Sequence, residues 1–173
     1  MIFMSQSTMV RTEWLYQFGL WYQYHLSMMR SVPGIRSAQR FETAHPAHPA
    51  SLALYTVPGP EIFKDPCYLE VRGLREWLPF IDKSFHKRNL FDGLEAAPEV
   101  SMDCRLLVVD RDEPDASLTG LNWLTAVGLD FSPRFRGLAV VRADVDRALN
   151  VCNDLAVYVP VSGYRDPELF PKT

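Results

Sequence analysis

A single histidine, His25, lies in an apolar stretch of the chain together with tyrosines that could share its chemistry. Tyr22 and Tyr24 lie within three residues of it, and Tyr55 follows in a later apolar run. An imidazole titrates near neutral pH and can act as a general acid or base, and a phenol can donate a hydrogen bond to a substrate oxygen. We therefore expect His25 to be the acid or base, with Tyr22 or Tyr55 as hydroxyl donor. The alternative is a structural histidine that hydrogen-bonds to the backbone.

Arg40 is the candidate for binding an anion. Residues 36, 38 and 40 lie on one face of a predicted strand, since strand side chains alternate. If that face lines a cavity, the Arg40 guanidinium could bind a carboxylate or an enolate oxygen. The alternative is a solvated or salt-bridged arginine, and this is the interpretation that we favour for Arg36.

Several aromatic residues are expected to form the pocket wall that binds the substrate, or to fill the core beside it. They are Trp14, Phe18, Trp21, Tyr24 and Trp77.

Other polar clusters are weaker candidates. His45 and His48 would need further ligands to hold a metal, and the acidic segment 110–115 lacks the spacing of an EF-hand. The segment 86–88 is a short basic cluster that could attract an anionic substrate, although we favour a solvated helix end. The three cysteines are far apart in the sequence, and there is neither a glycine-rich phosphate loop nor a GxSxG motif. We expect no metal and no nucleotide cofactor.

Composition limits the class of protein. The chain has 173 residues, of which 47% are hydrophobic and 23% charged, with a formal net charge of -3. These values are typical of a globular protein and argue against a nucleic-acid binder, which would usually be basic. No apolar run is long enough to span a membrane, and the N-terminal residues lack the features of a signal peptide. We expect a cytoplasmic protein.

Hydrophobic periodicity predicts a mixture of helices and strands. Apolar or aromatic residues at 14, 18, 21, 25, 28 and 32 predict a helix over 13–31, and Pro33-Gly34 ends it. Further helices are expected at 60–72 (broken at Pro66), 74–86 and 118–130. Strands are expected at 2–10, 35–43, 51–57, 88–92, 104–112, 135–143 and 155–161, and the second and third of these should form an antiparallel hairpin.

The order strand, helix, strand, strand occurs in both halves of the chain. We therefore expect two β-α-β-β repeats with antiparallel sheets, the first in residues 1–93 and the second, degenerate one in residues 94–173 with a C-terminal tail. Val127 falls where His25 would lie in the second repeat, so the site should belong to residues 1–93 alone.

Part of the sequence resembles a known superfamily. The matching stretch reads Trp21-Tyr22-x-x-His25-Leu26-x-x-Met29-x-x-Val32-Pro33-Gly34, followed by Ala38-x-Arg40-Phe41 and Leu52-Ala53-Leu54-Tyr55. It resembles the dimeric α+β barrel superfamily, in its EthD-like and stress-responsive A/B-barrel branch. The resemblance implies a ferredoxin-like α+β barrel and a homodimer, although a chain with two repeats could close its barrel alone. Tyr24 replaces the acidic residue that often precedes the histidine in this branch.

These observations lead to one functional expectation with two alternatives. We expect a small-molecule enzyme that acts on a hydrophobic, aromatic or polyketide-like compound by His/Tyr acid-base chemistry, as a cyclase, isomerase, dehydratase or cofactor-independent oxygenase. The first alternative is a non-catalytic, stress-associated barrel that binds a lipophilic ligand. The second, which the resemblance permits, is a haem-binding barrel with His25 as axial ligand.

Overall fold

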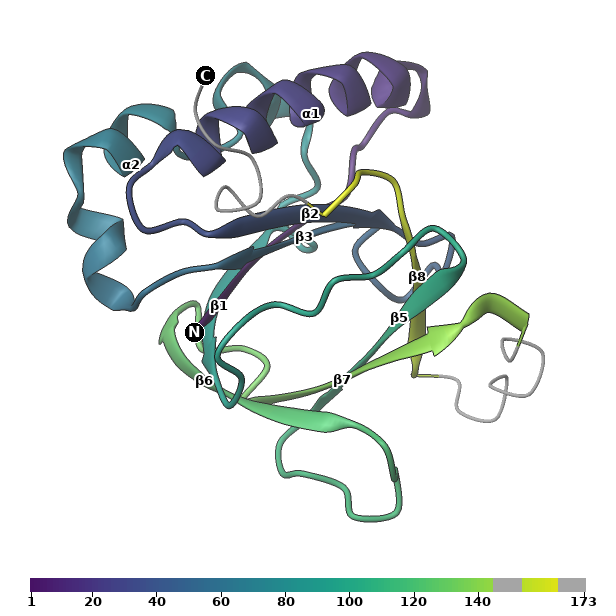
Figure 1. Ribbon diagram of the computed structural model, residues 1–173. Helices are drawn as coiled ribbons and strands as arrows, with labels where there is room; N and C mark the ends of the chain where they lie inside the picture. Colours follow the sequence, from purple (N-terminus) through teal and green to yellow (C-terminus); the bar gives the residue numbers. More distant parts are fainter. Residues whose placement is uncertain (145–153, 165–173) are drawn as a thin grey trace.

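The chain forms a closed barrel of antiparallel strands, shown by a computed structural model that describes residues 1–144 and 154–164 (Figure 1). The strands are β1 (Ile2–Ser7), β2 (Ser37–Glu42), β3 (Ser51–Thr56), β4 (Lys87–Asp92), β5 (Cys104–Arg111), β6 (Asn122–Leu129), β7 (Phe135–Arg142) and β8 (Ala156–Pro160). Around the barrel they follow the order β1-β3-β2-β8-β5-β7-β6-β4, and β4 pairs with β1 to close it.

Each half of the chain contributes one arc of the barrel. The first arc runs β4-β1-β3-β2 and the second runs β8-β5-β7-β6. The two junctions between the arcs are unequal. Four residue pairs join β4 to β6, and only two, Phe41–Pro160 and Glu42–Val159, join β2 to β8. The barrel therefore closes within one chain and needs no second copy to complete it. The homodimer stays a prediction.

The helices lie over the first arc. They are η1 (Thr12–Trp14), α1 (Leu15–Ser31), η2 (Pro60–Lys64), α2 (Pro66–Val71) and η3 (Arg75–Phe80). Figure 1 shows α1 lying along the outside of β2 and β3, with α2 beside it. The Asp65 carboxylate caps α2 by accepting hydrogen bonds from two backbone N–H groups. In residues 1–144 and 154–164, no helix is long and apolar enough to cross a membrane.

Strand alternation divides the apolar side chains of the first arc into two cores. Ile2, Met4 and Leu54 point into the barrel and form its lumen core, with residues of the second arc. The intervening residues, including Phe3 and Tyr55, point outward and pack beneath α1. The buried residues of α1 are Phe18, Tyr22, His25, Leu26 and Met29. Two of them, Phe18 and His25, belong to the predicted apolar series, and the other three lie beside it on the helix.

The ferredoxin-like α+β fold implied by the resemblance is wrong, and with it the EthD-like and stress-responsive A/B-barrel assignment. The structure is one closed barrel of eight strands with one long helix, α1 of 17 residues, and α2 has only 6. The two predicted β-α-β-β repeats are also wrong, because β5 is followed directly by another strand. The resemblance covers residues 14–92. Within that range α1 and the β2–β3 hairpin form as predicted, but the match leaves the second half of the chain undetermined.

Two segments that were predicted as helices do not form them, which is why the structure has more strand and less helix than expected. Residues 118–130 form β6 instead, which pairs with both β4 and β7. Gly120 and Gly128 disfavour a helix there, while β-branched Thr125 and Val127 suit a strand whose alternate residues face solvent. Residues 74–86 form only η3, which contains Pro79, followed by turns. The other strand predictions are confirmed, with ends shifted by a few residues.

Candidate functional site

A cavity of about 340 Å³ opens on the outer face of the first arc, beneath α1 and beside the segment from α2 to η3. Its walls combine three kinds of side chain. His25 and Tyr55 are buried at its base, arginines 72, 75 and 88 stand toward its solvent side, and apolar residues such as Phe3 lie between them. This volume is at the lower end of the range of ligand pockets and suits a compound of one or two rings.

His25 is held as a neutral base in this cavity. Only 4% of the residue is exposed, and its ring stacks on Trp21 at a centroid distance of 4.9 Å and meets the edge of Tyr22 at 5.6 Å. Burial, reinforced by the positive charge of Arg75 and opposed by Glu76, lowers the pKa of His25 to about 4. Its Nδ1 atom is buried, and no described residue bonds to it. A neutral imidazole in this position can accept a proton from a bound molecule.

Two buried tyrosines beside His25 keep their protons. Burial raises the pKa of Tyr22 and raises that of Tyr55 well above its ordinary value, and hydrogen bonding between the two phenols acts on both. Ser5 also hydrogen-bonds to Tyr22. Because α1 carries Tyr22 and β3 carries Tyr55, the pair links the helix to the sheet. Tyr55 lines the cavity and can present its phenol to a substrate oxygen.

The solvent side of the cavity is positively charged. Arg72 follows α2, Arg75 begins η3 and Arg88 lies on β4. Burial lowers the pKa of His86, and Arg88 lowers it further, with Asp130 opposing. Among the described residues that line the cavity, none is an aspartate or a glutamate. A negative charge that develops inside would be stabilised by this field.

Arg40, the predicted anion-binding residue, is occupied elsewhere. It lies on the face of β2 beneath α1, where its Nη2 atom is 2.6 Å from Glu42 Oε1 and its Nε donates to Ser51 Oγ at 3.0 Å. The guanidinium also lies over the rings of Tyr22, at 4.9 Å, and Phe18, at 5.6 Å. These contacts satisfy the cation, and Arg40 is not among the residues that line the cavity.

The predicted aromatic wall forms a cluster behind His25. Trp77 lies between Phe18, at 5.4 Å, and Trp14, at 6.3 Å, and Phe18 stacks on Trp21 at 5.8 Å. None of these four rings lines the cavity, so their contact with it passes through the stacked pair of Trp21 and His25. Through the stacking of Trp21 on His25, this cluster fixes the plane of the imidazole.

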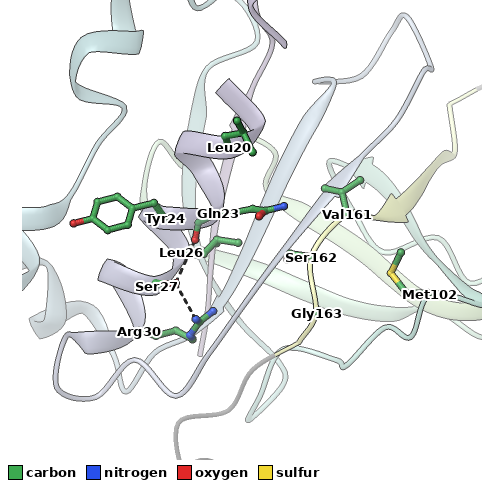
Figure 2. A pocket seen from close by; sticks show the side chains of 10 residues that line it. All are labelled: Leu20, Gln23, Tyr24, Leu26, Ser27, Arg30, Met102, Val161, Ser162 and Gly163. Atoms are coloured by element: carbon green, nitrogen blue, oxygen red, sulfur yellow. Dashed lines mark hydrogen bonds between the residues drawn. The ribbon is translucent and has the colours of Figure 1, made fainter. Parts of the chain in front are cut away.

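Tyr24 lies outside the site. It is 65% exposed and borders a separate groove of about 560 Å³ between α1 and the segment after β8. Figure 2 shows the groove lying between α1 and Val161, with Met102 beyond, and the Tyr24 ring turned away from both. On the helix side, Arg30 donates to the Ser27 hydroxyl at 3.2 Å. The groove brings together no acid-base pair.

A polar cluster lies at one end of the barrel lumen. Arg136, which is 1% exposed, forms two hydrogen bonds of 2.7 and 2.8 Å with the Asp110 carboxylate. Tyr158 donates to the Pro49 carbonyl nearby. Asp110, the first residue of the acidic segment 110–115, therefore pairs with a buried cation. Among the described residues, no group of three or more His, Cys, Asp and Glu side chains could hold a metal ion.

The structure thus brings two of the predicted residues, His25 and Tyr55, into one cavity, with Tyr22 in contact with both. Tyr68, Arg72 and Arg75 also line the cavity and were not predicted to do so, because they lie in segments predicted as ordinary helices. The basic cluster at 86–88 was a usable signal, since two of its three residues line the cavity.

The comparisons leave the interpretation to this geometry, since no family model, no curated protein and no solved structure matches the chain.

Proposed function

We propose that the protein is a small-molecule enzyme that transfers protons on a hydrophobic, aromatic or polyketide-like compound without a nucleotide cofactor. The observation that carries the proposal is the buried, neutral His25, whose Nδ1 lacks a partner in the described part of the chain. An unsatisfied polar atom in a buried position is uncommon and often marks a functional group. The residue that carries this atom lines a cavity that is also lined by a protonated tyrosine.

The proposed step is abstraction of a proton from carbon next to a carbonyl group. His25 takes the proton, the electron pair of the C–H bond moves toward the carbonyl, and an enolate oxygen forms. Tyr55 donates a hydrogen bond to that oxygen, and the arginines stabilise its charge. Return of the proton from His25 to another atom of the substrate completes an isomerisation. In a cyclisation, the enolate carbon forms a bond to the carbon of a second carbonyl, the π electrons of that carbonyl move to its oxygen, and the resulting alkoxide takes the proton back from His25.

The second candidate is a non-catalytic protein that binds a lipophilic ligand, and one observation favours it. Histidines that act as bases are commonly oriented by a carboxylate or a carbonyl on their second nitrogen. Neither ring nitrogen of His25 has a hydrogen bond to a described residue that would orient it, and the ring is positioned by stacking on Trp21. In this reading the imidazole is a hydrogen-bonding partner for the ligand.

Hydrogen–deuterium exchange separates the two functions without knowledge of the full reaction. The protein would be incubated in heavy water with a panel of aromatic β-dicarbonyl compounds, and deuterium at the acidic carbon would be followed by NMR. We expect exchange that His25→Ala abolishes, that Tyr55→Phe slows by about 10- to 100-fold, and that the exposed control Tyr24→Phe leaves unchanged. Binding of these compounds without any enhanced exchange would support the non-catalytic protein.

A further inference from the structure

The arginines at the cavity are free to bind a ligand. Neither Arg72 nor Arg88 makes a side-chain hydrogen bond or an ion pair with a described residue. Arg75 donates to the backbone carbonyl of Glu70, which anchors it with other N–H groups unused. The guanidinium of Arg40 differs from these three, because it donates to a carboxylate and to a hydroxyl group within the protein.

These cations act on the interior of the cavity as well as on its rim. Arg88 and Arg72 both lower the pKa of Tyr68, against the larger effect of burial, which raises it. Arg75 adds to burial in lowering the pKa of His25. Glu76 and Asp130 act in the opposite sense on the two histidines and are the weaker influence in each case. The charged side chains that line the cavity therefore give it an excess of positive potential.

Two different elements carry two of these arginines to the cavity. Arg72 follows the last residue of α2, which Asp65 caps. Arg88 belongs to β4, where its partner across the ladder is Ser5 and its N–H donates to Asp130 Oδ2 at 2.6 Å. Phe3 and Tyr55 line the same cavity and stack on each other at 5.3 Å. The cavity therefore combines an apolar aromatic surface with cationic side chains.

We propose that the ligand of this cavity is an aromatic compound bearing a carboxylate, which Arg72 and Arg88 bind while its ring lies against Phe3 and Tyr55. Guanidinium groups suit this task, since their N–H groups match the two oxygens of a carboxylate. The inference rests on the proposed function for the location of the site, and it adds the substrate class. It also assigns Arg72 and Arg88 as binding residues.

Binding of a matched pair of probes tests the assignment. Para-fluorobenzoate and its uncharged amide, para-fluorobenzamide, have nearly the same shape, and fluorine NMR gives a Kd for each. We expect the carboxylate to bind at least about tenfold more tightly than the amide. Arg72→Gln and Arg88→Gln should each weaken carboxylate binding by about 5- to 10-fold and leave amide binding unchanged, whereas the control Arg36→Gln, outside the cavity, should change neither.

Equal affinity for the two probes, unchanged carboxylate binding in both arginine variants, or no binding of either probe at millimolar concentration would overturn the inference. Circular dichroism of the variants guards against loss of fold, and both arginines lie at the surface or only half-buried. The His25→Ala variant separates this result from the proposed function. If the arginines are needed for carboxylate binding but no compound exchanges its proton, the proposed enzyme is refuted and the carboxylate assignment stands. If only neutral compounds exchange and carboxylates do not bind, the enzyme stands and the carboxylate assignment is refuted.

Discussion

Replacement of His25 by glutamine should change how stability depends on pH. His25 has an ordinary pKa of 6.5 when the chain is unfolded and about 4 when folded. As pH falls below 6.5, His25 therefore binds a proton in the unfolded chain but stays neutral in the folded protein. The free energy of unfolding decreases until the pH reaches about 4. At about 1.4 kcal/mol per pKa unit, His25 alone removes about 2.5 kcal/mol of stability between pH 7.5 and 4.5.

Urea denaturation followed by tryptophan fluorescence at these two pH values measures the effect. The wild-type protein should lose about 2.5 kcal/mol more than the His25→Gln variant over the interval, after other groups cancel in the difference. His45→Gln, in the loop between β2 and β3, is the matched control and should follow the wild-type protein. Parallel pH dependences in the wild-type and His25→Gln proteins would refute the reasoning that burial keeps this imidazole neutral.

Three further substitutions test packing in and around the barrel by the same denaturation assay. Asp110→Ala leaves the buried cation of Arg136 without its carboxylate and should cost about 3 kcal/mol; a loss below about 1 kcal/mol would contradict the assigned pair. Gly137→Ala, on the outer face of the second arc, places a Cβ only 2.9 Å from a methyl group of Leu121 and should cost about 1–3 kcal/mol. Tyr22→Phe removes a buried hydroxyl and should cost about 1 kcal/mol, whereas Tyr24→Phe, exposed on the same helix, should cost nothing measurable.

Local patterns predicted α1 and the strands other than β6 correctly and failed at two predicted helices, residues 74–86 in the first half and residues 118–130 in the second. The spacing of apolar residues placed α1, and the turn residues Pro33 and Gly34 ended it. In and just before β6, Leu121, Leu124 and Val127 recur every third residue, and this spacing resembles that of a helix. The structure buries Leu124 in the barrel and leaves Val127 39% exposed, because ladders with β4 and β7 decide the conformation. Such pairing is a long-range property that a local period does not contain.

The site shows the same division between local and long-range information. Placing His25 on the buried side of α1 required only helical spacing, and the structure agrees. Arg40 does lie on the strand face beneath the helix, but Glu42, two residues later on the same face, neutralises it. Period-two spacing could have identified that pair. The convergence of Arg72 and Arg88 could not be predicted, because it depends on how α2 is set against β4.

Closure of the barrel determines how this chain can meet other chains. Every strand has a neighbour on both sides, so the sheet offers no free edge to a peptide or to another copy, and association must use side-chain surfaces. The protection depends on the narrow β2–β8 junction, where two residue pairs are supplemented by the bond from Val161 N–H to the Arg40 carbonyl at 2.9 Å. Unzipping there would create two edges at once. That seam is the place where amide hydrogen exchange between strands should be fastest and where aggregation of this protein would begin.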